Sequence, residues 1–203
     1  MDLLALISFA AVLGVARAAP GPTVAALVAR VLGRGTAGAP SFCLGLLVSD
    51  ILWLTAAVLG LAVLAETFHA LFVALKYLGS AYLLYLAWKL WTAPAAPLAA
   101  APMPGEGIRL FLAGIAVGSG NPKTMLFYLA LLPSLLPLEA ITATDWAMLA
   151  TTQIVVYGAI LIGYVVLAAR ARRAFASARA MRWVNRVTGG IMAGAAVAVA
   201  TRS

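Results

Sequence analysis

Long apolar runs, separated by short polar segments, fill almost the whole sequence. A helix that crosses a bilayer core of about 30 Å needs about 20 apolar residues, and six runs reach or approach that length. They are residues 3–30, 38–64, 68–91, 108–137, 146–169 and 185–201. With 65% hydrophobic and 10% charged residues, the chain has more apolar side chains than a soluble domain of 203 residues can bury. The sequence therefore predicts an all-α, polytopic membrane protein with six transmembrane helices, or five if the short last run lies at the interface.

Lysine and arginine residues gather in and directly beside the first, third and fifth connections between these runs. They are Arg30, Arg34, Lys89, Arg109, Arg170, Arg172, Arg173, Arg179, Arg182 and Arg186. Basic residues mark the cytoplasmic side of a membrane protein, and the second and fourth connections contain none. We therefore expect a multi-pass protein of the inner membrane with both termini outside. The net charge of +8 then reflects contact with the lipid bilayer and not a nucleic-acid partner.

Residues 92–107 lack helical periodicity and have the sequence TAPAAPLAAAPMPGEG. This composition predicts a cytoplasmic linker between two halves of the chain. Each half, residues 1–91 and 108–203, holds three predicted spans. With an odd number of spans per half, two repeats would lie upside down relative to each other, as in many secondary transporters. Gly190 and Gly194 in the last run allow close approach of another helix; we expect packing inside the bundle, with a homodimer as the alternative.

The chain has few residues suited to metal, redox or nucleophilic chemistry. Cys43 is its single cysteine and His69 its single histidine, so neither an internal disulfide nor a cluster with metal-ligand spacing is expected. No nucleophile with an adjacent base is evident. We therefore expect no cofactor, no metal and no enzymatic activity.

The start of the chain imitates a secretory signal, because an apolar stretch precedes the small-residue pattern of residues 16–18. However, Asp2 stands where a signal would have basic residues, and the apolar run resumes soon afterwards. We therefore interpret this segment as a retained span.

After the basic residues near the connections are assigned, four charged residues remain deep inside the apolar runs: Arg17, Asp50, Lys76 and Lys123. Burying such a group in lipid without a partner costs roughly 3 kcal/mol on insertion scales, so each should face a partner or water. Asp50 and Lys123 lie deepest, and we expect them to take part in transport, with a static salt bridge as the alternative. Lys76 could extend to the interface, and Arg17 could likewise have no role in transport.

Prolines interrupt two of the runs at corresponding places. Residues 19–28, APGPTVAALV, lie deep in the first run, and residues 120–129, GNPKTMLFYL, lie deep in the fourth. A proline removes a helical hydrogen bond and clashes with the preceding turn, so Pro20, Pro22 and Pro122 should open their helices. Simple kinks are the alternative. Open backbone at membrane depth requires protein or water around it, and paired interruptions indicate a transporter site.

Such a site suits a small zwitterion. The amino ends of half-helices carry partial positive charge and would attract a carboxylate, while Asp50 could bind an ammonium group or carry a coupling proton. Tyr82, Gln153 and Tyr157 would bring polar groups to the pocket, although tyrosines in such helices more often serve packing.

Taken together, these motifs resemble the lysine exporter (LysE) family, including its homoserine/threonine-resistance branch. The resemblance covers nearly the whole chain. It rests on PGPT (20–23), GLLVSDILW (45–53), YLGSAYLLYLAWKL (77–90), GNPKTMLFYLALLP (120–133) and VNRVTGGIMAGAAVAVA (184–200).

The resemblance implies proton-driven export of amino acids or related metabolites through a six-helix inverted-repeat bundle. It places the site at Pro20, Gly21, Pro22, Asp50, Asn121, Pro122 and Lys123. Two residues depart from the family pattern: Thr23 stands where the family often has asparagine or aspartate, and Arg17 is not expected before the prolines. These departures leave the solute open and could favour an acid over a cationic amino acid.

Two further interpretations remain open. A metal or other small-solute transporter of the wider superfamily would need a histidine, cysteine or acidic cluster that the sequence lacks. In a non-transporting membrane assembly protein, the buried charges would form static pairs.

Overall fold

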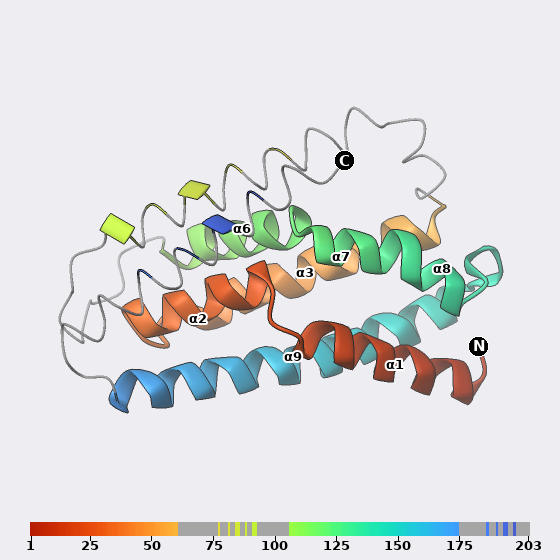
Figure 1. The fold of residues 1–203 in the computed structure, drawn as a ribbon. Helices are drawn as coiled ribbons and strands as arrows, with labels where there is room; N and C mark the ends of the chain where they lie inside the picture. Colours follow the sequence, from red (N-terminus) through yellow and green to blue (C-terminus); the bar gives the residue numbers. More distant parts are fainter. Residues whose placement is uncertain are drawn as a thin grey trace.

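The computed structural model describes residues 1–60 and 106–174, together with residues 77, 81, 84, 85, 88, 91, 92, 186, 190, 193, 194 and 197 (Figure 1). Every regular element in these residues is a helix, which agrees with the predicted all-α class. Most residues of the predicted spans 68–91 and 185–201 and of the linker 92–107 lie outside the described residues. The six-helix count and the inverted repeat therefore stay predictions.

The first apolar run forms two helices, α1 (Leu3–Ala18) and α2 (Pro22–Arg34). The two helices are bent by 54° relative to each other. Between them Gly21 is fully extended, with φ −157° and ψ −175°, and Pro22 is the first residue of α2, a position where its missing N–H leaves no hydrogen bond unmade. The predicted opening at the prolines of the first run is thus confirmed.

The fourth apolar run is also interrupted. Helix α6 (Glu106–Ser119) ends before Gly120, and α7 (Pro122–Leu126) begins two residues later with Asn121 as its N-cap. Five π-helical residues, η1 (Phe127–Leu131), and the short α8 (Leu132–Leu135) follow. Pro133, the second residue of α8, has no N–H, so it cannot donate a hydrogen bond to the preceding turn. The N–H of Leu132 bonds to the carbonyl of Phe127 five residues back.

Two helices are long and apolar enough to cross a membrane unbroken: α3 (Ala39–Val58) and residues 143–172 of α9 (Ala143–Ala174). The bent α1–α2 pair would make a third span. A single 3-10 turn, η2 (Leu138–Ala140), precedes α9. Leu44 and Leu52 on α3 and Val155 and Ile162 on α9 are exposed, as expected of side chains that face acyl chains.

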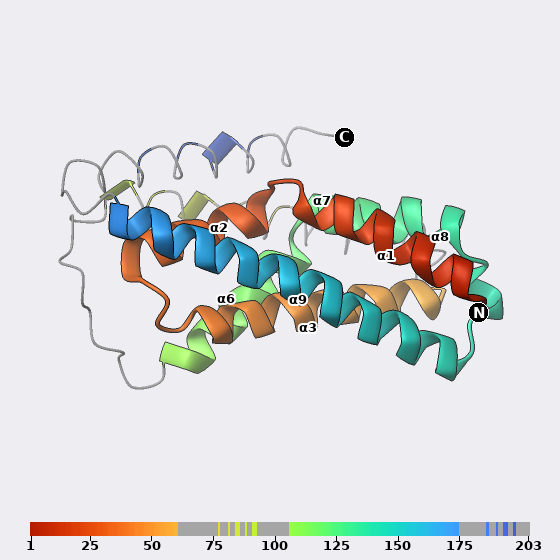
Figure 2. The same cartoon turned by 90° about the horizontal axis from the view of Figure 1, so that it is seen from below.

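The two broken segments run in opposite directions along the bundle. From the N-terminus, α1 and then α2 lead to the far end, whereas α6, α7 and α8 lead back toward the N-terminal end (Figures 1 and 2). Both breaks therefore lie part of the way along the bundle, between its two ends.

Helices α3 and α6 approach each other through glycines. A Cβ atom on Gly45 would collide with the carbonyl oxygen of Phe111 and lie 2.9 Å from Cα of Gly114. One turn later, Ser49 Oγ lies 3.2 Å from Ser119 Oγ. Small residues that let two backbones approach closely are typical of helix pairs in membranes. This contact fixes the helix that carries Asp50.

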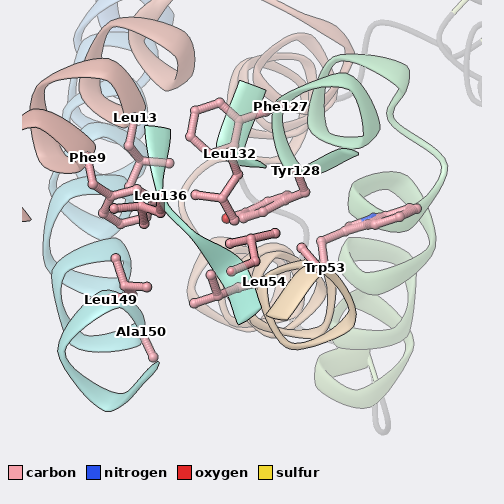
Figure 3. Packing of buried hydrophobic residues seen from close by; sticks show 12 residues of the cluster. Phe9, Leu13, Trp53, Leu54, Phe127, Tyr128, Leu132, Leu136, Leu149 and Ala150 are labelled. Carbon is pink, nitrogen blue, oxygen red and sulfur yellow. The ribbon is translucent and has the colours of Figure 1, made fainter. Parts of the chain in front are cut away.

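Two apolar clusters lie on either side of the breaks. One joins α2, α3, α6 and α9, with Leu27, Phe42, Leu46, Val117, Tyr157 and Leu161 among its members. The other joins α1, α3, η1, α8 and α9 (Figure 3); among its members are Phe9, Leu13, Trp53, Leu54, Phe127, Tyr128, Leu132 and Leu149. The charged residues considered next lie where these clusters meet.

Candidate functional site

The two helix breaks, 98 or more residues apart in sequence, meet in the structure. Lys123 Nζ, from the first turn of α7, donates to the carbonyl oxygen of Ala19 at 2.6 Å. Asn121 Nδ2 lies 3.4 Å from Thr23 Oγ1. A Cβ atom on Gly21 would lie 3.5 Å from Cδ of Lys123. The lysine side chain therefore crosses the first break in close contact with the backbone of Gly21.

These contacts satisfy backbone groups that the breaks set free. A helix leaves its last carbonyls without partners, and its carboxyl end favours a cation. At the end of α1, Tyr164 donates to the carbonyl of Ala18 at 2.6 Å and Lys123 donates to that of Ala19. At the start of α7, Asn121 Oδ1 accepts from the N–H of Lys123 at 3.1 Å. Gly21, the N-cap of α2, has no side chain and provides no such cap.

A buried ion pair lies beside the breaks. Arg17, in the last turn of α1, places Nη2 2.8 Å from Oδ2 of Asp50 in α3, and the two side chains are 4% and 2% exposed. Arg17 Nη1 also donates to Thr124 Oγ1 of α7 at 2.8 Å. Removing one partner of such a pair would leave an uncompensated buried charge. Arg17, whose role the sequence left open, is thus the partner of Asp50 in this structure.

Three aromatic rings surround the guanidinium group of Arg17. Its Cζ lies 5.4 Å from the ring centre of Phe127, 5.6 Å from that of Tyr128 and 5.1 Å from that of Tyr157. Aromatic faces attract cations at such distances, most strongly where water is excluded. The rings come from both apolar clusters, so Arg17 is enclosed by the two together.

Tyr128 connects the ion pair to α9. Its hydroxyl donates to Oε1 of Gln153 at 2.6 Å and lies 3.5 Å from Oδ2 of Asp50. Gln153 is fully buried, and its Nε2 has no hydrogen-bond partner in the described part of the chain. The site therefore extends from the first break across Asp50 and Tyr128 to the middle of α9.

Most residues singled out in the sequence come together here. The set comprises Arg17, Pro20, Gly21, Pro22, Thr23, Asp50, Asn121, Pro122, Lys123, Gln153 and Tyr157, all within the breaks or their contacts. Lys76 and Tyr82 lie outside the described residues. Lys123 does not pair with Asp50 but caps the end of α1.

Four residues at the site were not anticipated: Thr124, Phe127, Tyr128 and Tyr164. Thr124 and Tyr128 are four residues apart, the spacing that puts two side chains on one face of a helix, and Thr124 follows Lys123 directly. That spacing could have indicated Tyr128. The π-helical turn beside it, a feature frequent at functional sites, is visible in the structure alone.

Within the described ranges, no three histidine, cysteine or acidic side chains gather as metal ligands. The arrangement is instead one of fixed charges, hydroxyl groups, amides and aromatic rings around two open helix ends. It offers an ammonium acceptor in Asp50 and cationic donors in Arg17 and Lys123, the groups that bind small charged or zwitterionic solutes.

Comparison with known proteins points to a family of transporters. Residues 15–203 match the model of the LysE type translocator family. The chain is 25% identical over 185 residues to an uncharacterized membrane protein of Vibrio cholerae, covering 90% of both chains. It is 30% identical over 136 residues to a leucine efflux protein of Salmonella typhimurium, covering 66% of this chain and 64% of that protein.

A third relative is a homoserine/homoserine lactone efflux protein of Salmonella typhi, 28% identical over 176 residues, with 85% of this chain and 84% of that protein covered. No solved structure matches the chain.

Proposed function

Because the chain belongs to the LysE type translocator family, we propose that it is a secondary transporter that exports amino acids or related small zwitterionic metabolites from the cytoplasm. The observation that carries this proposal is the meeting of two broken helices around a buried ion pair, through Lys123 and Ala19. Interrupted helices that face each other at membrane depth are how many secondary transporters form their substrate sites.

We place this site near the middle of the membrane. Helix α1 has 16 residues and α2 has 13, so the first break divides its segment nearly in half. In the proposed architecture, residues 1–91 and 108–203 are inverted three-helix repeats joined by the linker 92–107, and both termini lie outside. The opposite directions of α1–α2 and α6–α8, each interrupted just before a proline, support this symmetry (Figures 1 and 2).

Asp50 is the group that we propose to couple transport to protons. Its carboxylate pairs with Arg17 at 2.8 Å in a site closed to water. The proton and the ammonium group of the solute would compete for the Asp50 carboxylate. A proton that enters from outside would neutralise Asp50 and release the solute, and loss of that proton to the cytoplasm would restore the charge that accepts the next ammonium group.

Efflux from reconstituted vesicles tests the proposal. Purified protein is inserted into liposomes loaded with radiolabelled leucine or homoserine, the solutes named in two relatives, and a proton gradient is imposed. We expect efflux that the gradient accelerates. In Asp50→Asn we expect the rate per inserted molecule to fall by about tenfold or more, as the loss of an interaction of about 1.4 kcal/mol would produce.

Glu106→Gln is the matched control, because it removes a carboxylate that also pairs with arginine but lies at the end of the bundle. Its efflux should resemble that of the wild-type protein. If the wild-type protein released neither these solutes nor any other amino acid, the proposed function would be wrong. Efflux unaffected by the gradient, or by Asp50→Asn, would refute the coupling role alone.

A further inference from the structure

The site contains more buried hydrogen-bond donors than acceptors. A guanidinium group has five N–H donors, yet Nε and Nη2 of Arg17 make no hydrogen bond in the described part of the chain, although Nη2 is in ionic contact with Asp50. On α9, Nε2 of Gln153 also has no partner. Arg17 is 4% exposed and Gln153 fully buried. Buried donors almost always have a partner, so each exception requires an explanation.

The side of Arg17 that carries Nε and Nη2 is the side that a carboxylate uses. Nε and one Nη form a side of the guanidinium group whose two parallel N–H bonds match the two oxygens of a carboxylate. Nη1 is already committed to Thr124 at 2.8 Å, which leaves the Nε and Nη2 side. Asp50 pairs with Nη2 through Oδ2, whereas Nε has no hydrogen-bond partner in the described part of the chain, so the internal pair uses less than the full capacity of Arg17.

Gln153 lies close enough to share such a ligand. It is joined to Asp50 through the Tyr128 hydroxyl, which is 2.6 Å from Oε1 of Gln153 and 3.5 Å from Oδ2 of Asp50. The unpartnered amide therefore belongs to the same connected group as the unpartnered side of Arg17. Two free donors from two helices, α1 and α9, indicate a ligand that is rich in acceptors.

Accepting the transport function proposed above, we propose that Arg17, aided by the Gln153 amide, binds the carboxylate of the solute while Asp50 receives its ammonium group. The Arg17–Asp50 pair separates to hold the two ends of a zwitterion. A solute without a carboxylate leaves the donors unsatisfied and forfeits most of the binding.

The charges at the site add a preference among amino acids. Arg17 and Lys123 are cationic and Asp50 is anionic, so these three groups sum to +1. A second positive charge on the solute would be repelled by this excess, whereas a neutral side chain would not. The site therefore selects neutral amino acids such as leucine over lysine.

Ligand pairs in which one member lacks the free carboxylate test this inference on the wild-type protein. Binding to the full-length protein in detergent is followed by thermal stability, because a ligand stabilises the folded form in proportion to its occupancy. The pairs are leucine with leucinamide and homoserine with homoserine lactone; each member keeps its ammonium group. We expect the carboxylate member to bind at least about tenfold more tightly, and lysine to bind more weakly than leucine.

Two variants identify the residues responsible. Arg17→Gln should abolish the preference for the carboxylate member. Gln153→Met, which keeps the side chain's length and leaves the ion pair intact, should reduce that preference and serves if the first variant folds poorly. Arg30→Gln is the control, because Arg30 is also partly buried and its Nε has no hydrogen-bond partner in the described residues, but it lies two turns along α2 from the break. The preference of this variant for the carboxylate member should equal that of the wild type.

Equal binding of the amide and the acid by the wild-type protein would overturn the inference, as would an undiminished preference in both site variants. In either case efflux of leucine or homoserine from vesicles would leave the transport function standing. Absence of both efflux and binding for every amino acid tried would instead remove the proposed function, and this inference with it.

Discussion

The structure contains two arginine–carboxylate clusters, and they differ in their surroundings. Arg17 and Asp50 are 4% and 2% exposed and lie between two apolar clusters. At the end of the bundle, Arg30 and Arg34 of α2 reach Glu106 of α6 at 3.2 and 3.8 Å, with side chains 12%, 57% and 18% exposed. The end cluster also has an alternative partner, because Arg30 donates to the carbonyl of Ala37 at 2.6 Å.

The residue types of the two clusters are alike, so burial is what distinguishes the pair that we propose to act in transport from the pair that only connects two helices. Exposed pairs contribute about 0–1 kcal/mol, because water and salt screen them. In a buried pair each charge depends on the other, since the loss of one partner leaves an ion in an apolar environment. We therefore expect a solute or proton that binds one member of the Arg17–Asp50 pair to change the conformation there. The same event at the Arg30–Glu106 pair should have little influence.

The largest expected effect is on stability at the buried pair. Asp50→Asn leaves Arg17 buried without a counterion and should lower the free energy of unfolding by about 3–5 kcal/mol. The double variant Arg17→Gln with Asp50→Asn removes both charges and should recover most of that loss. Denaturant titration of the purified proteins in detergent measures both changes.

Transport by the same double variant distinguishes an ion pair that only stabilises the fold from one that takes part in transport. If the pair served structure alone, the stable double variant would transport like the wild type. We expect it to be stable and inactive. A double variant as unstable as the single one would show that the two charges do not depend on each other.

A second effect, of intermediate size, concerns the helices that connect the two clusters. Helix α3 carries Asp50 and packs against α6, which begins at Glu106. Gly45→Ala would place a methyl group against the backbone of α6 and should lower the free energy of unfolding by about 1–3 kcal/mol, as overpacking does. Thermal unfolding in detergent provides the measurement.

Gly33→Ala provides the contrast. Gly33 lies inside α2, and a Cβ atom there has nothing within 4 Å in the described structure. Replacing such a glycine removes its entropic disadvantage and should stabilise the helix by about 0.5–1 kcal/mol. Similar effects of the two substitutions would mean that the glycine contact does not determine how α3 and α6 pack.

The smallest effect is expected at the end cluster. Glu106→Gln should change the free energy of unfolding by no more than about 1 kcal/mol, because Arg34 is largely exposed and Arg30 keeps its bond to Ala37. The difference from the wild type should shrink further as salt is added. A loss as large as that of Asp50→Asn, insensitive to salt, would erase the distinction between the clusters.

The helix breaks were predictable from local chemistry. Pro20, Pro22 and Pro122 cannot continue a helix wherever the chain goes, and the structure interrupts both segments at these residues. The apolar runs likewise predicted α3 and α9, although α9 extends from 143 to 174 where 146–169 was expected. These features depend on residues a few positions apart.

The partners of the charges were not predictable in this way. From the sequence, Asp50 could have paired with Lys123, Lys76 or Arg17, because each lies in an apolar run and each would gain from a counterion. In the structure Arg17 forms the ion pair with Asp50, and Lys123 donates a hydrogen bond across the first break to the carbonyl of Ala19. The choice follows from the glycine contact of α3 with α6 and from the direction in which α7 leaves its break.

The amino-acid sequence by itself determined that this chain forms apolar helices, where two of them break and which charged groups must be shielded from lipid. The tertiary structure alone decided that Tyr128 and Thr124 join Arg17 and Asp50 in one site. The reason is physical: helix formation and interruption are governed by backbone hydrogen bonds between near neighbours, whereas an ion pair across 33 residues, or a hydrogen bond across 107, depends on how whole helices pack.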